Sequence, residues 1–155
     1  MRVGLGYDSH MFMPGIKLIL GGVEVHYHQG LLGHSDGDAL AHAIIDAVLG
    51  AIGEGNIGVL FPDTDPAYKD ADSLQLLKEV VHIAHSKGYK IISMDSTVLA
   101  EEPKLNPYIN TMKENLARTL GTDAVSVKAK TNEKMGWVGK GEGIAAMAVC
   151  LLERE

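Results

Sequence analysis

Two histidines and one aspartate are spaced so that they could share a metal ion. Asp8 and His10 stand two residues apart after a short β-prone run, and side chains two apart on an extended chain point to the same side. His42 lies in a segment with helical spacing and offers a third donor. Two imidazoles and one carboxylate with an open fourth position are typical of a catalytic zinc site, and the open position would accept a phosphate oxygen.

The same three residues also have an ordinary interpretation. Asp8 and His10 would make a turn or capping interaction, and His42 would be a partly buried histidine without a ligand. The preceding segment His34-Ser35-Asp36-Gly37-Asp38 favours the metal, because it places acids and a further histidine next to His42.

Asp38, His42 and Asp46 are spaced by four and therefore share one stripe of a helix. We expect one of the two acids to accept the second ring N–H of His42 and so fix its tautomer. A solvated helix face is the alternative. The other histidines lack such neighbours and are expected to have no chemical role; they are His26, His28, His82 and His85.

Three further segments suit an anionic substrate. Residues 55–66 form a long acidic loop whose glycines can offer backbone N–H groups to an oxyanion. Residues 100–106 combine a proline-stiffened turn with one cation, although Asn106 and Pro107 would equally suit the N-cap and first turn of a helix. Residues 130–143 hold lysines, glycines and Glu133, and one carboxylate suffices for Mg²⁺ on a polyphosphate. The alternative for this last segment is a mobile hairpin.

Composition narrows the class of protein. A chain of 155 residues, 46% hydrophobic, predicts a single domain over residues 1–155. A net charge of −6 gives no general attraction to nucleic acid or anionic lipid. Cys150, in an apolar run too short for a membrane helix, is expected to be buried, and a cytoplasmic location fits.

Hydrophobic periodicity and turn residues predict an α+β domain, with a mixed β-sheet, helices packed on one face and a short β-hairpin. Strands are expected over residues 2–7, 17–20, 23–27, 89–99, 125–130 and 144–152. Helices are expected over residues 38–49 with Gly50 as terminator, from Asp72 or Ser73 to Gly88, and over residues 107–120 before Gly121. The last two strands are expected to pair across the glycine-rich segment.

Taken together, several blocks resemble the 2-C-methyl-D-erythritol 2,4-cyclodiphosphate synthase family of the non-mevalonate isoprenoid pathway. Their order and spacing match across nearly the whole chain. The blocks are Asp8-Ser9-His10, His34-Ser35-Asp36-Gly37-Asp38 through His42, Phe61-Pro62-Asp63-Thr64-Asp65-Pro66, Pro103-Lys104 and Thr131-Asn132-Glu133-Lys134. The resemblance implies a homotrimer with active sites between neighbouring subunits and a cavity on the threefold axis.

The resemblance also implies the reaction. The 2-phosphate of 4-diphosphocytidyl-2-C-methyl-D-erythritol 2-phosphate attacks its own β-phosphorus, which closes the cyclic diphosphate and releases CMP. The enzyme class is a phosphorus-oxygen lyase. A metal-dependent phosphohydrolase using the same ligands is the alternative, and a non-catalytic trimeric binding module with a structural metal is a third possibility.

The resemblance assigns Asp8, His10 and His42 to a divalent cation such as zinc, and Glu133 to a second, Mg²⁺ or Mn²⁺, on the substrate diphosphate. His34 and Thr131 match positions of transition-state stabilisation. The implied substrate contacts are Asp8, His10, His34, Ser35, Asn56, Ile57, Gly58, Phe61, Pro62, Asp63, Thr64, Asp65, Ala100, Glu101, Glu102, Pro103, Lys104, Leu105, Asn106, Lys130, Thr131, Asn132, Glu133, Trp137 and Lys140.

The sequence departs from the family pattern at four positions. Asn56 replaces an aspartate, Ala39 a valine and Trp137 a phenylalanine. Lys140 replaces an arginine near the trimer axis and keeps the charge without the bidentate fork. This last change leaves open whether the central cavity binds isoprenoid diphosphates.

Overall fold

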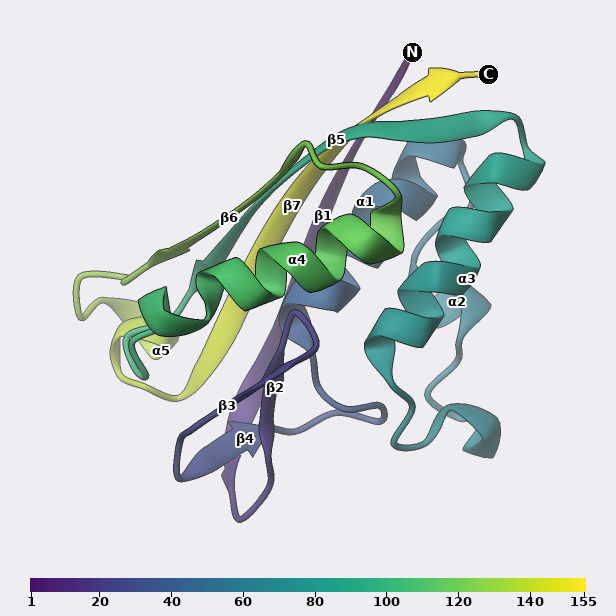
Figure 1. The fold of residues 1–155 in the computed structure, drawn as a ribbon. Helices are drawn as coiled ribbons and strands as arrows, with labels where there is room; N and C mark the ends of the chain where they lie inside the picture. Colours follow the sequence, from purple (N-terminus) through teal and green to yellow (C-terminus); the bar gives the residue numbers. More distant parts are fainter.

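A five-stranded mixed sheet runs through the computed structural model, which describes residues 1–155 (Figure 1). Its strand order is β4-β1-β7-β5-β6, and only β5 and β6 are parallel neighbours. The strands are β1 (Arg2–Pro14), β4 (Gln29–Leu31), β5 (Tyr89–Leu99), β6 (Val125–Lys130) and β7 (Gly143–Arg154). The predicted hairpin is present as β2 (Leu18–Leu20) and β3 (Val23–Val25).

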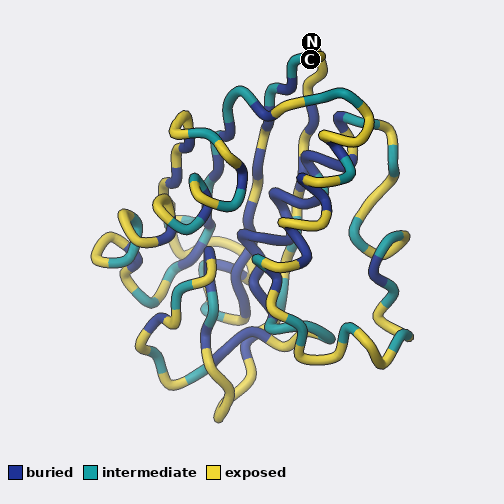
Figure 2. The backbone as a smooth tube through the Cα atoms, turned by 45° about the vertical axis from the view of Figure 1, so that its right-hand side comes forward, coloured by how far each residue is buried: buried dark blue, intermediate teal, exposed yellow.

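Three long helices cover one face of the sheet (Figure 1). They are α1 (Ala39–Ile52), α3 (Ser73–Ser86) and α4 (Ile109–Leu120). The connections hold four short helices, α2 (Ile57–Leu60), η1 (Pro66–Tyr68), η2 (Asn106–Tyr108) and α5 (Gly136–Gly139). The buried residues gather between the helices and the sheet, and α1 is buried along most of its length (Figure 2). The predicted α+β class is confirmed.

Helix α1 lies unusually close to β1. A Cβ atom on Gly4 or Gly6 would stand 1.8 Å from the carbonyl oxygen of Ala47 or Ala43, respectively. Only glycine permits this approach, because any larger side chain would overlap the helix backbone. The even-numbered residues of β1 therefore face α1, and Asp8 and His10 belong to this set.

The other face of the sheet is bare. Odd-numbered residues of β1 point there, and Leu5 is 68% exposed and Tyr7 52%. Val149 of β7, the cross-strand partner of Leu5, is 40% exposed. The helices lie on the opposite side (Figure 1). None of the helices has both the length and the apolar stretch that crossing a bilayer requires.

Four sequence expectations about the elements are wrong. Strand β1 extends to Pro14, so Asp8 and His10 lie inside the strand and do not follow it. Gly50 lies within α1, which ends at Ile52 and is capped by Gly53 in the left-handed conformation. Asn106 makes no capping bond and begins η2, so the long helix starts only at Ile109. Strands β6 and β7 do not pair, because β5 stands between them.

Candidate metal centre and active site

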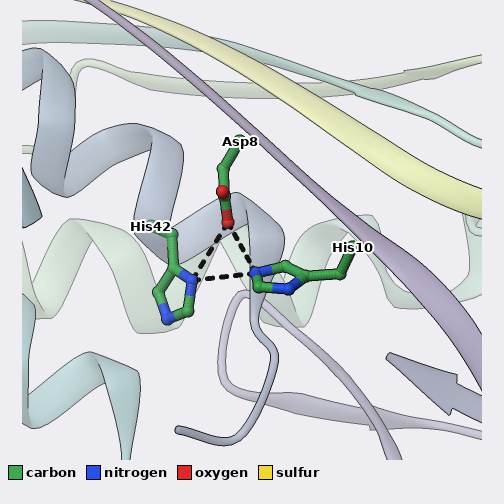
Figure 3. A group of neighbouring side chains, drawn as sticks. All are labelled: Asp8, His10 and His42. Atoms are coloured by element: carbon green, nitrogen blue, oxygen red, sulfur yellow. Dashed lines mark hydrogen bonds and ion pairs between the residues drawn. The ribbon is translucent and has the colours of Figure 1, made fainter. Parts of the chain in front are cut away.

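Asp8, His10 and His42 converge on one point, as predicted (Figure 3). Asp8 Oδ2 lies 2.7 Å from His10 Nε2 and 3.0 Å from His42 Nδ1, and the two nitrogens are 3.1 Å apart. Tetrahedral zinc with bonds of about 2.0–2.1 Å separates neighbouring ligand atoms by about 3.3 Å. The triangle is therefore nearly the size that a small divalent cation requires.

The tautomers of both histidines suit a cation. His10 Nδ1–H donates to the carbonyl oxygen of Leu32 at 2.8 Å, which leaves a lone pair on Nε2. His42 Nε2–H donates to Ser73 Oγ at 2.8 Å, with Ser35 Oγ at 2.9 Å. Its Nδ1 lone pair therefore faces the other two donors. When both rings are neutral in these tautomers, two nitrogen lone pairs and a carboxylate oxygen face one another with no proton between them, so the donor set fits a divalent metal.

The hydroxyl of Ser73 is itself fixed. It donates to Asp36 Oδ1 at 2.5 Å, so it can only accept from His42. Ser73 is fully buried at the start of α3, and its backbone N–H donates to the other oxygen of Asp36 at 3.0 Å. A chain of hydrogen bonds from His42 through the Ser73 hydroxyl to the Asp36 carboxylate thus sets the tautomer of His42.

Neither acid expected to orient His42 does so. Asp38 is buried and caps α1 through the Ala41 N–H at 2.9 Å, and it also accepts from Gly21 and Gly22 of the hairpin turn. Asp46 accepts from the Ile57 N–H at 2.7 Å and so fastens α2 to α1. Ser73 is recognisable in the sequence only as a helix start, because its partners His42 and Asp36 lie more than 30 residues away along the chain.

Electrostatics keep Asp8 ionised. Burial raises the pKa of Asp8, but the hydrogen bonds and charges of His10 and His42 outweigh burial and lower that pKa to about 2. Burial lowers the pKa of His10, whereas the hydrogen bond and charge of Asp8 raise it more, so the net shift is upward. A cation at this point would take the place of the protons that otherwise hold the three side chains together.

A pocket of about 380 Å³ opens beside the triangle. Its size lies within the usual range of small-molecule sites. The pocket is lined by Asp8, His10, Gly33, His34, Ser35, His42, Ile57, Gly58, Phe61, Asp63, Tyr68 and Leu76. Three of these, Gly33, Tyr68 and Leu76, were missed by sequence reasoning. Backbone and apolar contacts of this kind leave no distinctive residue pattern.

The acidic loop is tied to this pocket by His34. Its Nε2–H donates to the Asp65 carbonyl oxygen at 2.9 Å. Asn56 Oδ1 accepts from the Val59 N–H and caps α2, and Asp65 caps η1 in the same way. Pro62, Thr64, Asn56 and Asp65 do not line the pocket itself.

A second, smaller pocket of about 160 Å³ lies at the ends of β5 and β6. It is lined by Ala100, Pro103, Lys104, Leu105, Asn106, Ala129, Lys130 and Thr131. Glu133 stands on the adjacent turn, exposed, with its Oε1 3.4 Å from Thr131 Oγ1. Trp137 and Lys140 line neither pocket. The predicted residues that line a pocket therefore form two groups, one at β1 and α1 and the other at the far edge of the sheet, whereas Trp137 of α5 and Lys140 directly after it belong to neither.

Comparison with known proteins agrees with this geometry. The model of the YgbB family matches residues 1–153. The 2-C-methyl-D-erythritol 2,4-cyclodiphosphate synthase of Geotalea uraniireducens is 59% identical over the whole of both chains. A solved 2C-methyl-D-erythritol-2,4-cyclodiphosphate synthase with bound CDP is 36% identical, with a TM-score of 0.90 over 98% of this chain and 100% of that one.

The bifunctional IspDF of Campylobacter jejuni has a TM-score of 0.95 at 42% identity. The similarity covers 99% of this chain but 42% of that longer one. With the fold, the metal-binding geometry and the full-length matches in agreement, the chain belongs to the YgbB family, whose curated relatives are 2-C-methyl-D-erythritol 2,4-cyclodiphosphate synthases.

Proposed function

We propose that the chain converts 4-diphosphocytidyl-2-C-methyl-D-erythritol 2-phosphate to 2-C-methyl-D-erythritol 2,4-cyclodiphosphate with release of CMP, as a phosphorus-oxygen lyase. The observation that carries the proposal is the convergence of Asp8, His10 and His42 beside a pocket, in a chain of this family. The reaction is an intramolecular attack, and alignment within one site can contribute on the order of 7–11 kcal/mol.

In this proposal Asp8, His10 and His42 hold a zinc ion, and Glu133 helps to hold Mg²⁺ or Mn²⁺ with the substrate diphosphate. Bound cations would neutralise phosphate oxygens that otherwise repel one another. His34 and Thr131 offer an imidazole and a hydroxyl to the transition state. A general base is unnecessary, because the attacking phosphate is already a nucleophile.

The two pockets would bind the two ends of the substrate. The pocket beside the triangle receives the methylerythritol phosphate, with Ser35 and Asp63 able to bond its hydroxyl and phosphate groups. The pocket with Lys104 and Lys130 receives the cytidine phosphate, where two cations offset the negative charge of the chain. A free, buried Cys150 is compatible with a reducing cytoplasm, where we place the enzyme.

We propose a homotrimer in which one chain's first pocket meets a neighbour's second. Strands β1 and β6 are three strand spacings apart, about 14 Å. Within one chain the two pockets are therefore separated across the sheet, one near β1 and the other at the β6 edge. The bare apolar face around Leu5, Tyr7 and Val149 supports association, because a face of this kind is normally covered by a partner.

Product analysis tests the reaction. The purified protein is incubated with the cytidylyl substrate and Mg²⁺ in ¹⁸O-water, and we expect CMP and an unlabelled cyclic diphosphate. Label in released phosphate would instead indicate a phosphohydrolase. Absence of CMP with fully metal-loaded protein would indicate a binding module.

A further inference from the structure

Glu101 joins two turns at the far edge of the sheet. Strands β5 and β6 run parallel and end together, with Leu99 paired to Lys130, and the chains then diverge. One oxygen of Glu101, Oε1, accepts from the Asn132 N–H at 2.8 Å and from the Lys134 N–H at 3.2 Å. A single carboxylate oxygen thus fastens the turn after β6 to the end of β5.

That turn has an unfavourable backbone. Glu133 and Lys134 have φ of 52° and 61°, so two successive residues with Cβ atoms are left-handed. Such conformations persist only where the surroundings hold them. The Asn132 side chain contributes by donating to the Met135 carbonyl at 2.8 Å.

Helix α5 supports the turn from behind. A Cβ atom on Gly139 would stand 2.2 Å from the carbonyl carbon of Lys134, so the helix backbone lies directly against it. Glu101 is half-buried on the other side. The turn is therefore held between a glycine contact and a charge-assisted pair of hydrogen bonds, which are stronger than neutral ones.

We propose that Glu101 is a positioning residue that holds this turn so that Thr131 and Glu133 present their side chains to the substrate. The resemblance had placed Glu101 among the substrate contacts. The Glu101 carboxylate would repel an anionic cytidylyl substrate. Its negative charge is instead stabilised by the two backbone N–H groups that donate to it. The inference rests on the proposed function, since the turn matters only if Thr131 and Glu133 act on that substrate.

The test compares Glu101→Ala with Lys134→Gly and with the double variant. Glycine adopts positive φ freely, so Lys134→Gly should restore the turn when the carboxylate is lost. We expect Glu101→Ala to lower kcat for CMP release about tenfold or more, and to weaken Mn²⁺ binding in the presence of CDP by a similar factor. The double variant should recover to within about threefold of Lys134→Gly alone.

Two further measurements separate positioning from other roles. Hydrogen exchange of the Asn132 and Lys134 amides should accelerate in Glu101→Ala, while zinc content stays unchanged. Glu114→Ala, an exposed acid on α4, is the matched control and should alter none of these quantities.

Two results would overturn the inference. One is Glu101→Ala with unchanged amide exchange and unchanged kcat. The other is a rise in KM alone that Lys134→Gly does not reverse, which would make Glu101 a substrate contact. If the unaltered protein released no CMP, the proposed function would fail instead, and the exchange measurement would still report on the turn.

Discussion

At the scale of single residues, the affinity for zinc should depend on Ser73, which is not itself among the proposed ligands. Ser73 accepts the Nε2–H of His42 because its own proton is directed to Asp36. Ser73→Ala removes the main acceptor and leaves Ser35, so we expect zinc affinity to fall about tenfold, and about 100-fold when Ser35→Ala is added. Competition with a chelating dye measures both constants.

The imidazole ¹⁵N shifts of the metal-free protein provide an independent readout. They should show His42 protonated at Nε2 in the unaltered chain and a mixture of tautomers in Ser73→Ala. Ser86→Ala, at the other end of the same helix, is the control. An unchanged zinc affinity and an unchanged His42 tautomer in Ser73→Ala would show that the Ser73 hydroxyl does not orient His42.

The three candidate metal donors could be predicted from the sequence, but the residues that orient them could not. Asp8 and His10 share a strand face at any register, and His42 stood on a recognisable helix. The contact between His42 and Ser73 depends instead on how α1 and α3 pack, which local spacing does not encode. The same limit explains why Asp38 and Asp46 were wrongly assigned to His42.

Burial should make the one cysteine inert. Desolvation raises the pKa of Cys150 to about 11, so the thiolate is scarce at pH 8. Since the thiolate is the reactive species, we expect negligible reaction with a disulfide reagent in the native protein and complete reaction in denaturant. Rapid native labelling would contradict the packing of β7 against the helices.

At the scale of elements, the close contact between α1 and β1 predicts opposite effects on stability for alanine at two glycines, Gly50 of α1 and Gly6 of β1. Gly50 is exposed, and an added Cβ would stand 3.9 Å from the Leu5 carbonyl oxygen, so Gly50→Ala should stabilise the protein by roughly 0.5–1 kcal/mol through helix propensity. Gly6→Ala would overlap the Ala43 carbonyl and should destabilise it by about 3 kcal/mol. Denaturant unfolding measures both, and equal effects would contradict the close approach.

Element identities were largely predictable, whereas several ends and neighbours were not. Residues 89–99 and 125–130 form strands as expected, because β-branched runs there are bounded by turn residues. Gly50 was expected to end its helix, yet tertiary packing of α1 on β1 extends it to Ile52. Strand order is set by long-range pairing, which explains why β7 could not be placed between β1 and β5.

At the scale of the whole molecule, the bare sheet face should determine assembly and, through it, activity. Leu5 and Val149 are directly opposite on β1 and β7, and both are exposed in the single chain. A carboxylate introduced there would be buried against neighbouring copies at a cost of several kcal/mol. We therefore expect Leu5→Glu to yield monomers in sedimentation experiments, and we expect the unaltered chain to yield the proposed trimer.

Activity should be lost together with assembly, because each complete site would need residues of two chains. CMP release by Leu5→Glu should fall by at least about 100-fold, while zinc binding by the monomer, which needs only Asp8, His10 and His42, should persist. Gln75→Glu adds the same charge on the helical side and should leave mass and rate unchanged. A fully active monomer would show that one chain's two pockets serve one substrate without a neighbour.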